Sequence, residues 1–397
     1  MGQEPCFFMN EIDHQQDIVY LNYAATSFPK SKIALDSFYK SLCAPPSGIR
    51  QNGSDTLLQE MRKRAAALLN ISASSVYFTH SATVGLNQVI KGFIKKDSCL
   101  AIDNRSHNAV VRPWLSLKHS CRCLLASLYD EEDQFIKSRL FEALAHSPKL
   151  FCLTHASNVN GSIYPVEEIM DLIRLHSPTT AILIDASQSA GALNLSSLHQ
   201  ADFLVFPSHK HLHSVPGAAV LVAKKHLEPI ILGGTGVNSM VEETLNQHDY
   251  FAEVGTMNLP AIQALVDSLA FAHDTTKEHQ KKESLLVSQF LEGVRHIEGL
   301  QIIGKGDEEN RLAIIALKPA YGSPELHWAS FLKTQKIFVR GGVHCSPLHH
   351  QQLKLEESGT LRFSFGWDST SEHIEKALSA LREFSIIAKE VFSNAAL

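Results

Sequence analysis

The chain has 397 residues, of which 44% are hydrophobic and 19% charged, as is typical of a globular protein with one large or two medium domains. A formal net charge of −5 argues against a nucleic-acid partner, and no apolar run is long enough for a membrane span. The seven scattered cysteines and the lack of a secretion signal in MGQEPCFFMNEIDHQ lead us to expect a reducing, cytoplasmic setting.

Short apolar segments in the first two thirds of the chain predict strands, and amphipathic segments between them predict helices. The strands are expected at 76–79, 99–103, 150–155, 181–185, 202–206 and 218–223. Segments 83–94 and 165–176 predict helices, the second because it opens with Pro165 and carries acids in its first turn. Apolar strands that alternate with helices predict an α/β fold, with a mainly parallel sheet covered on both faces.

The pattern changes near residue 260. Long helical segments are predicted at 261–274 and 277–297, followed by the strand candidates LQIIG, RLAIIAL, KIFVRGG and TLRFSFG and by helices near 324–335 and from 371. We therefore expect a large domain over 20–260 and a smaller α+β domain made of 1–19 and 261–397. The segment 41–55 is the most loop-like and is a candidate lid or active-site loop.

Polar side chains follow three of the predicted strands. Asp185 closes AILID, Lys210 follows DFLVFPSH, and Ser81 to Thr83 stand where VYFT turns into a helix. In a parallel sheet these positions meet at one edge, where ligands bind. Pyridoxal phosphate needs a Schiff-base lysine, an acid facing its pyridine nitrogen and an anchored phosphate. Taken alone, a lysine after a strand is more often a solvated loop charge, and Ser81 to Thr83 are more often an ordinary helix cap, but the set together predicts this cofactor.

With these motifs the chain resembles the class V aminotransferase family, in particular its NifS- and SufS-like cysteine desulfurases and selenocysteine lyases. The similarity runs from YLNYAATSFPK (20–30) to LRFSFGW (361–367) and includes, in the family's order, SNVNGSIYPVEEI, LIDASQSAG, DFLVFPSHK, GGTGVNS, EVGTMNLPAIQAL and RGGVHCSPLHH. The resemblance implies the fold type I architecture of pyridoxal phosphate enzymes. It also implies a homodimer whose active sites borrow residues across the interface.

The resemblance assigns roles around the cofactor ring. Lys210 corresponds to the Schiff-base lysine, and Asp185 to the acid facing the pyridine nitrogen. Gln188 matches the residue near the phenolic oxygen, and His107 matches the histidine stacked on the ring. Phosphate-binding positions are matched by Ala82, Thr83, Ser208, His209 and, toward the partner subunit, Thr256.

Two further matches concern the substrate. Asn158 corresponds to an amide that bridges cofactor and substrate. Arg362 corresponds to the arginine that binds the substrate carboxylate, a task suited to a planar guanidinium. The sequence departs from the family pattern in three places. Asn22 stands where an aspartate is usual, and the segments SATVGLN and HKHLHSVPGAA also differ, the second because it is poor in glycine.

Cys345 decides the expected reaction. It follows two glycines and has histidines on either side, which is typical of an accessible loop with cationic neighbours that favour a thiolate. In the resembling family this position carries the nucleophile that takes sulfur from the substrate, and the short loop implies a nearby sulfur-acceptor protein. We expect Lys210 to remove the α-proton of L-cysteine and Cys345 to become a persulfide while alanine is released.

Other functions stay open at this point. A selenocysteine lyase acting on L-selenocysteine, an epimerase or a transaminase would use the same fold, and a non-catalytic binding subunit would keep it without the chemistry. Intact Lys210, Asp185, His107 and Arg362 argue against the binding subunit. Cys121 and Cys123 form a C-x-C without a second ligand pair, so no metal site is expected.

Overall fold

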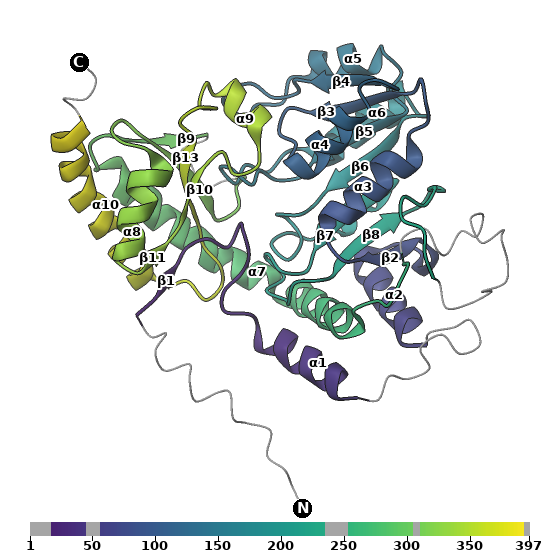
Figure 1. Ribbon diagram of the computed structural model, residues 1–397, viewed down its shortest axis with the longest axis horizontal. Helices are drawn as coiled ribbons and strands as arrows, with labels where there is room; N and C mark the ends of the chain where they lie inside the picture. Colours follow the sequence, from purple (N-terminus) through teal and green to yellow (C-terminus); the bar gives the residue numbers. More distant parts are fainter. Residues whose placement is uncertain (1–16, 45–55, 235–252, 305–309, 393–397) are drawn as a thin grey trace, which may run out of the picture.

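The computed structural model describes residues 17–44, 56–234, 253–304 and 310–392, which are built around two main sheets (Figure 1). The larger sheet has seven strands in the order β2-β8-β7-β6-β5-β3-β4. All of them share one direction except β8, which is antiparallel to both β2 and β7. The strands are β2 (Val76–Thr79), β3 (Cys99–Asp103), β4 (Arg122–Ala126), β5 (Leu150–Thr154), β6 (Ala181–Asp185), β7 (Phe203–Pro207) and β8 (Ala219–Ala223). The predicted α/β fold with a mainly parallel sheet is confirmed.

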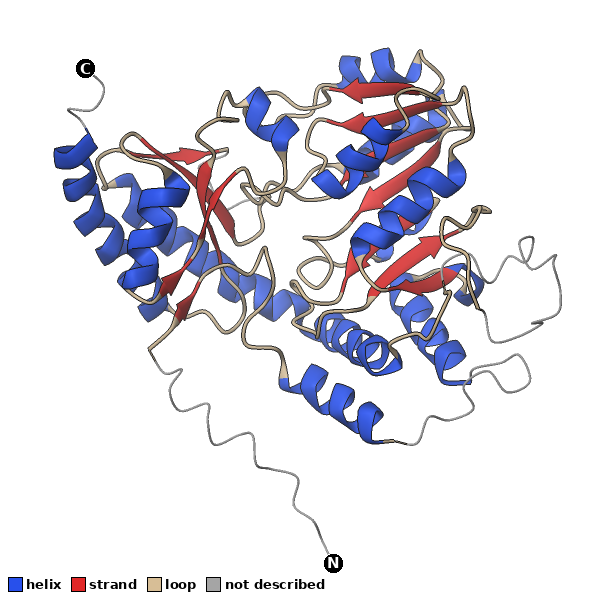
Figure 2. Ribbon diagram, in the orientation of Figure 1, coloured by secondary structure: helices blue, strands red, loops and turns tan. Residues whose placement is uncertain are grey.

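Helices cover both faces of this sheet (Figure 2). Because neighbouring residues of a strand point to opposite faces, Leu204 and Phe206 join one core while Phe203 and Val205 join the other. Helices α3 (Ala82–Phe93) and α4 (Asn108–Ser116) pack on the second of these faces. The opposite face is covered by α1 (Lys32–Cys43), α2 (Thr56–Leu69), α5 (Lys137–Leu144), α6 (Val166–His176) and the start of α7 (Leu259–Arg295).

The smaller sheet has the order β12-β13-β10-β9 and is antiparallel. One of its faces packs on the end of α7, on α10 and on α8, with Trp328 of an adjoining π-helix and Phe290 in this core. A two-stranded pair, β1 with β11, extends this region. The elements are β1 (Val19–Tyr20), β9 (Leu300–Ile303), β10 (Ile314–Pro319), β11 (Ile337–Phe338), β12 (Arg340–Gly342), β13 (Thr360–Ser364), the π-helix η5 (Pro324–Ala329), α8 (Ser330–Thr334), α9 (Pro347–Gln352) and α10 (Ser371–Phe392).

Two separate cores support the expected division into a large and a small domain, which remains a prediction. Helix α7 belongs to both of them, since Ile262 and Leu265 join the core of the large sheet while Phe290 and Val294 join that of the small one. Short 3-10 helices at Ala73–Ser75 and Ser196–Gln200 complete the secondary structure of the described ranges. No helix within those ranges is long and apolar enough to cross a bilayer.

The structure corrects two sequence predictions. The helices expected at 261–274 and 277–297 are one continuous helix. Within it, the Thr275 hydroxyl donates to the Phe271 carbonyl at 2.8 Å, so the polar side chain is satisfied without ending the helix. Strand β4 was not predicted, because it is a half-exposed edge strand without a continuous apolar run. Most of the candidate lid at 41–55, and most of GGTGVNS, lie outside the described residues.

Candidate active site

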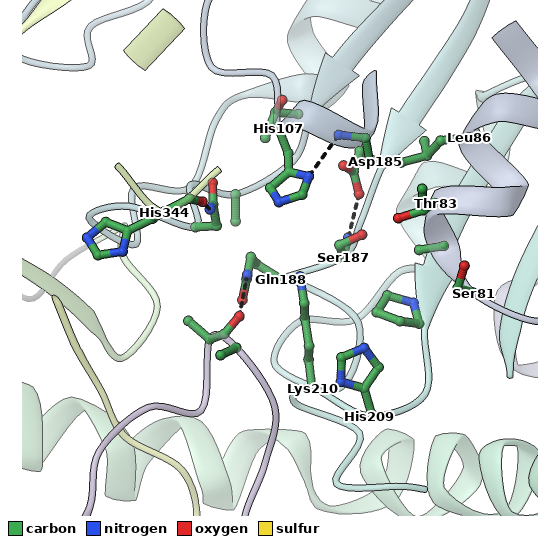
Figure 3. Close-up of a pocket in the computed structure, with 18 of the residues that line it drawn as sticks. Ser81, Thr83, Leu86, His107, Asp185, Ser187, Gln188, His209, Lys210 and His344 are labelled. Atoms are coloured by element: carbon green, nitrogen blue, oxygen red, sulfur yellow. Dashed lines mark hydrogen bonds between the residues drawn. The ribbon is translucent and has the colours of Figure 1, made fainter. Parts of the chain in front are cut away.

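A cavity of about 240 Å³ lies at the carboxyl ends of β5, β6 and β7. Segments far apart in the chain form its wall, including the loop around Ala24, the start of α3 and the small sheet. Figure 3 shows side chains from these segments around one open space. The structure brings most of the predicted site residues together here, namely Ala82, Thr83, His107, Asn158, Asp185, Gln188, His209, Lys210 and Arg362.

Lys210 and Asp185 form the charged centre of the cavity. Burial lowers the pKa of Lys210 to about 8, although the Asp185 carboxylate opposes this shift. Asp185 ends β6, and its Oδ1 accepts a hydrogen bond from the Ser187 amide at 3.0 Å. This bond orients the carboxylate and leaves Oδ2 for a ligand. The pair can therefore combine a lysine that is partly uncharged near neutral pH with a fixed carboxylate.

His107 is a neutral imidazole on the wall of this cavity. It caps helix α4, where its Nδ1 accepts a hydrogen bond from the Ala109 amide at 3.0 Å. Burial, together with the charge of Lys210, lowers its pKa to about 3. The proton of the neutral ring consequently sits on Nε2, and the ring offers a flat, uncharged surface to a bound ligand.

The start of α3 provides an anion site at one end of the cavity. Ser81 caps this 12-residue helix by accepting a hydrogen bond from the Val84 amide at 3.3 Å, and the Gly85 amide donates to the Ser81 carbonyl. In the described part of the chain this leaves the amides of Ala82 and Thr83 for a ligand. The positive end of the helix dipole adds to their attraction for a phosphate.

Lys30, which the sequence analysis missed, holds the chain beside Lys210. Its Nζ donates to the His209 carbonyl at 3.1 Å, to Thr26 Oγ1 at 2.9 Å and to Ser27 Oγ at 3.0 Å. The Ser27 amide donates to the same carbonyl at 2.9 Å. These contacts fix the peptide that joins His209 to Lys210, and burial lowers the pKa of Lys30 to about 8. The sequence signal for this lysine was the segment TSFPK, in which Lys30 follows the hydroxyl residues Thr26 and Ser27 by four and three positions.

Arg362 reaches the cavity from the small sheet because it alternates with core residues along β13. Leu361 and Phe363 enter the hydrophobic core, so the side chain between them points to the opposite face. Its Nη1 donates to the Asn158 carbonyl at 2.7 Å, and its Nη2 donates to Asn22 Oδ1 at 3.1 Å. Burial lowers its pKa to about 9. Because Asn22 is neutral where the resembling family usually has an aspartate, this contact does not neutralise the guanidinium.

Cys345 lies beside the cavity and is held near it by Arg340. The thiol is half-buried, and its Sγ is 3.8 Å from Arg340 Nη2, which donates to it. Arg340 itself lines the cavity, as does His344. The negative charge of a thiolate at Cys345 would raise the pKa values of Lys210 and Arg362, and so counteract the lowering that burial causes. Arg340 was not singled out from the sequence, although its position just before GGVHC was a signal.

Two predicted phosphate contacts do not line this cavity. Ser208 is fully buried, and its hydroxyl donates to the Val215 carbonyl, so it closes the loop after β7. Thr256 is exposed just before helix α7. An exposed position suits the expected contact with a partner subunit, and both roles remain predictions.

The residues present fit pyridoxal phosphate. Gln188 Oε1 and Arg362 Nε are buried without a hydrogen-bond partner among the described residues, which indicates a polar ligand in this space. The free amides of α3 suit the phosphate, Asp185 Oδ2 suits a protonated ring nitrogen, and Lys210 suits covalent attachment. The described residues contain no group of three or more His, Cys, Asp or Glu placed to hold a metal ion.

Comparison with known proteins agrees with this site. The family model for class V aminotransferases matches residues 19–377, and the chain belongs to this family. Its members are pyridoxal phosphate enzymes. The family resemblance in the sequence is thereby confirmed.

Two relatives and one solved structure show which members of the family this chain is similar to. The chain is 28% identical over 338 residues to a probable cysteine desulfurase of Methanothermobacter thermautotrophicus, with 83% of this chain and 84% of the relative covered. It is 27% identical over 393 residues to a probable cysteine desulfurase of Pyrococcus abyssi, covering 94% and 96%. The apo structure of the cysteine desulfurase from Thermococcus onnurineus has the same fold, with a TM-score of 0.83, 22% identity and coverage of 98% and 100%.

Proposed function

We propose that this protein is a pyridoxal phosphate-dependent cysteine desulfurase, which converts L-cysteine to L-alanine and retains the sulfur as a persulfide on Cys345. One observation carries the proposal: a cysteine thiol lies 3.8 Å from an arginine of the cavity wall, beside the lysine and carboxylate expected of this cofactor. The names of the relatives, probable cysteine desulfurases, support the same activity.

Binding and proton removal use three side chains. The Arg362 guanidinium would bind the substrate carboxylate, and Asp185 Oδ2 would accept a hydrogen bond from the protonated ring nitrogen of the cofactor. When bound, pyridoxal phosphate supplies the electron sink that makes the α-proton of the amino acid acidic. Lys210 Nζ takes this proton, because burial lowers its pKa to about 8 and leaves part of it uncharged near neutral pH.

Sulfur transfer uses Cys345. Its thiolate attacks the substrate sulfur, so that an S–S bond forms and the Cβ–S bond breaks. The electron pair of the broken bond stays on the substrate Cβ, which takes up a proton. Lys210 returns the α-proton to Cα, and the product leaves as alanine. Arg340 Nη2 stabilises the thiolate before the attack. The outer sulfur of the persulfide then passes to an acceptor protein.

The protein acts as a homodimer, in which the exposed Thr256 of one subunit completes the phosphate site of the other.

The test is to incubate the cofactor-loaded protein with L-cysteine and to measure both alanine and the mass of the peptide containing Cys345. We expect one alanine per added sulfur in the first turnover, and a reducible sulfur adduct on Cys345. The Cys345→Ser variant should bind cofactor and L-cysteine, as seen in its absorption spectrum, and release little alanine. Undiminished alanine from this variant would contradict the proposal and favour a lyase or transaminase that does not use the thiol. Parallel assays with L-selenocysteine and other amino acids define the substrate.

A further inference from the structure

The turn that carries Cys345 has an unfavourable backbone conformation. His344 has φ 53° and Cys345 has φ 58°, so two consecutive residues with side chains occupy the left-handed region. Side chains make this region costly, and such a pair persists only where its surroundings hold it. The contacts of this turn therefore bear on the position of the thiol.

One side-chain amide holds the turn on both sides of the thiol. Asn158 Nδ2 donates to the His344 carbonyl at 2.7 Å, and Asn158 Oδ1 accepts from the Ser346 hydroxyl at 2.6 Å. Between these two contacts, the Cys345 carbonyl accepts from the Asn108 amide at 2.8 Å. Each of the three residues 344–346 is thus bonded to a residue of the region around the large sheet.

The same asparagine is connected to the proposed carboxylate site. Its backbone carbonyl accepts from Arg362 Nη1 at 2.7 Å, and the residue lines the cavity. Its side-chain amide is already engaged by the turn, so a direct bridge between cofactor and substrate would have to compete with these bonds.

We propose that Asn158 is a positioning residue that holds the Cys345 turn in its left-handed conformation and fixes the thiol relative to Arg362. Ser346 acts through it, because Ser346 is fully buried and does not line the cavity. The effect on sulfur transfer rests on the proposed function, whereas the effect on the turn itself does not.

The variant Ser346→Ala separates positioning from direct ligand contact. It removes one bond of the Asn158 amide without altering the cavity wall. Ser385→Ala is the matched control, since the Ser385 hydroxyl also donates to a backbone carbonyl, that of Glu298, but lies on α10. Thermal unfolding followed by circular dichroism establishes that each variant is folded.

Hydrogen exchange of the peptide spanning 343–350 is the readout that needs no activity. We expect about fivefold faster exchange in Ser346→Ala, as the loss of one buried hydrogen bond implies, and wild-type exchange in Ser385→Ala. Asn158→Ala should exchange faster still, and the double variant Asn158→Ala/Ser346→Ala should match it, because Ser346 acts through Asn158. Wild-type exchange in Ser346→Ala, or additive effects in the double variant, would overturn the proposal.

The kinetic readout is the rate of persulfide formation on Cys345. In Ser346→Ala it should fall about fivefold while the KM for L-cysteine stays unchanged, because the turn moves and the cavity wall does not. A raised KM with an unchanged rate would instead assign Asn158 to ligand binding and overturn the positioning role. If wild-type protein forms no persulfide at all, the proposed function fails, and hydrogen exchange still decides whether Asn158 holds the turn.

Discussion

Arg340 and Arg362 lie directly opposite each other on the paired strands β12 and β13, and both line the same cavity. After burial, the charge of Arg340 is the largest influence that lowers the pKa of Arg362. Arg340, Arg362 and Lys210 place three basic side chains on the cavity wall, against the single carboxylate of Asp185 among the lining residues. Two like charges held this close are unfavourable without an anion, so the site is suited to a ligand that carries phosphate and carboxylate groups.

Replacing Arg362 tests the carboxylate site. We expect Arg362→Gln to raise the KM for L-cysteine by about 10- to 100-fold, since a charge-assisted hydrogen bond contributes roughly 1.5–3 kcal/mol. Steady-state kinetics measure this change, and the absorption spectrum reports whether the cofactor is retained. The control is Arg174→Gln, because Arg174 pairs with Asp202 away from the cavity. An unchanged KM in Arg362→Gln would remove Arg362 from substrate binding.

Lys210 is expected to attach the cofactor. The wild-type protein loaded with pyridoxal phosphate should absorb visible light, and borohydride should fix the cofactor to the peptide containing Lys210. Lys210→Ala should lose this labelling and all alanine formation while remaining folded, because Lys210 is the one lysine among the described residues that line the cavity. Peptide mapping by mass spectrometry identifies the site. Labelling that persisted on a different lysine would show the assignment to be wrong.

The half-buried Lys30 should stabilise the loop beside Lys210. Lys30→Met removes the hydrogen bonds to Thr26, Ser27 and the His209 carbonyl, so we expect the free energy of unfolding to fall by about 1–2 kcal/mol. Denaturant titration measures the loss, and the variant should also retain cofactor less well during dialysis. Lys32→Met is the control, since Lys32 is exposed on α1. Equal stability of the two variants would argue against a structural role for Lys30.

The expected homodimer can be tested through Thr256. Light scattering should give twice the mass of the chain, and Thr256→Ala should remain a dimer that binds cofactor about fivefold more weakly, the loss expected for one hydrogen bond to the phosphate. Thr334→Ala, at the end of α8, should bind normally. A fully loaded and active monomer would rule out a shared phosphate site.

Acid should destabilise the fold through buried neutral histidines. Burial lowers the pKa of His211 to about 4, below the 6.5 of an exposed histidine. Between these values the unfolded chain binds a proton that the folded chain does not, so stability falls as the pH drops from 6.5 toward 4. We expect a loss on the order of 1 kcal/mol for this group between pH 7 and 5.5.

The variant His211→Leu isolates that contribution. Between pH 7 and 5.5, the free energy of unfolding of this variant should fall by about 1 kcal/mol less than that of the wild type. Urea titrations at pH 7 and 5.5 make the comparison. An identical pH dependence in His211→Leu and wild type would mean that His211 is not a neutral buried group.

The sequence alone determined the fold class and the centre of the site. Apolar strands followed by amphipathic helices specify a parallel sheet, and the ends of such strands meet at one edge, so Asp185 and Lys210 could be placed together from their positions in the chain. The family motifs added His107, Gln188 and Arg362, which the structure brings to the same cavity.

Only the tertiary structure decided how these residues are held. Asn158 and His344 are 186 positions apart, and Lys30 and His209 are 179 apart, so no local pattern predicts their hydrogen bonds. The contact of Arg340 with the Cys345 thiol spans only five positions in the chain. The left-handed turn that carries this thiol, by contrast, is held by Asn158 and Asn108 from the region around the large sheet, so long-range packing determined it.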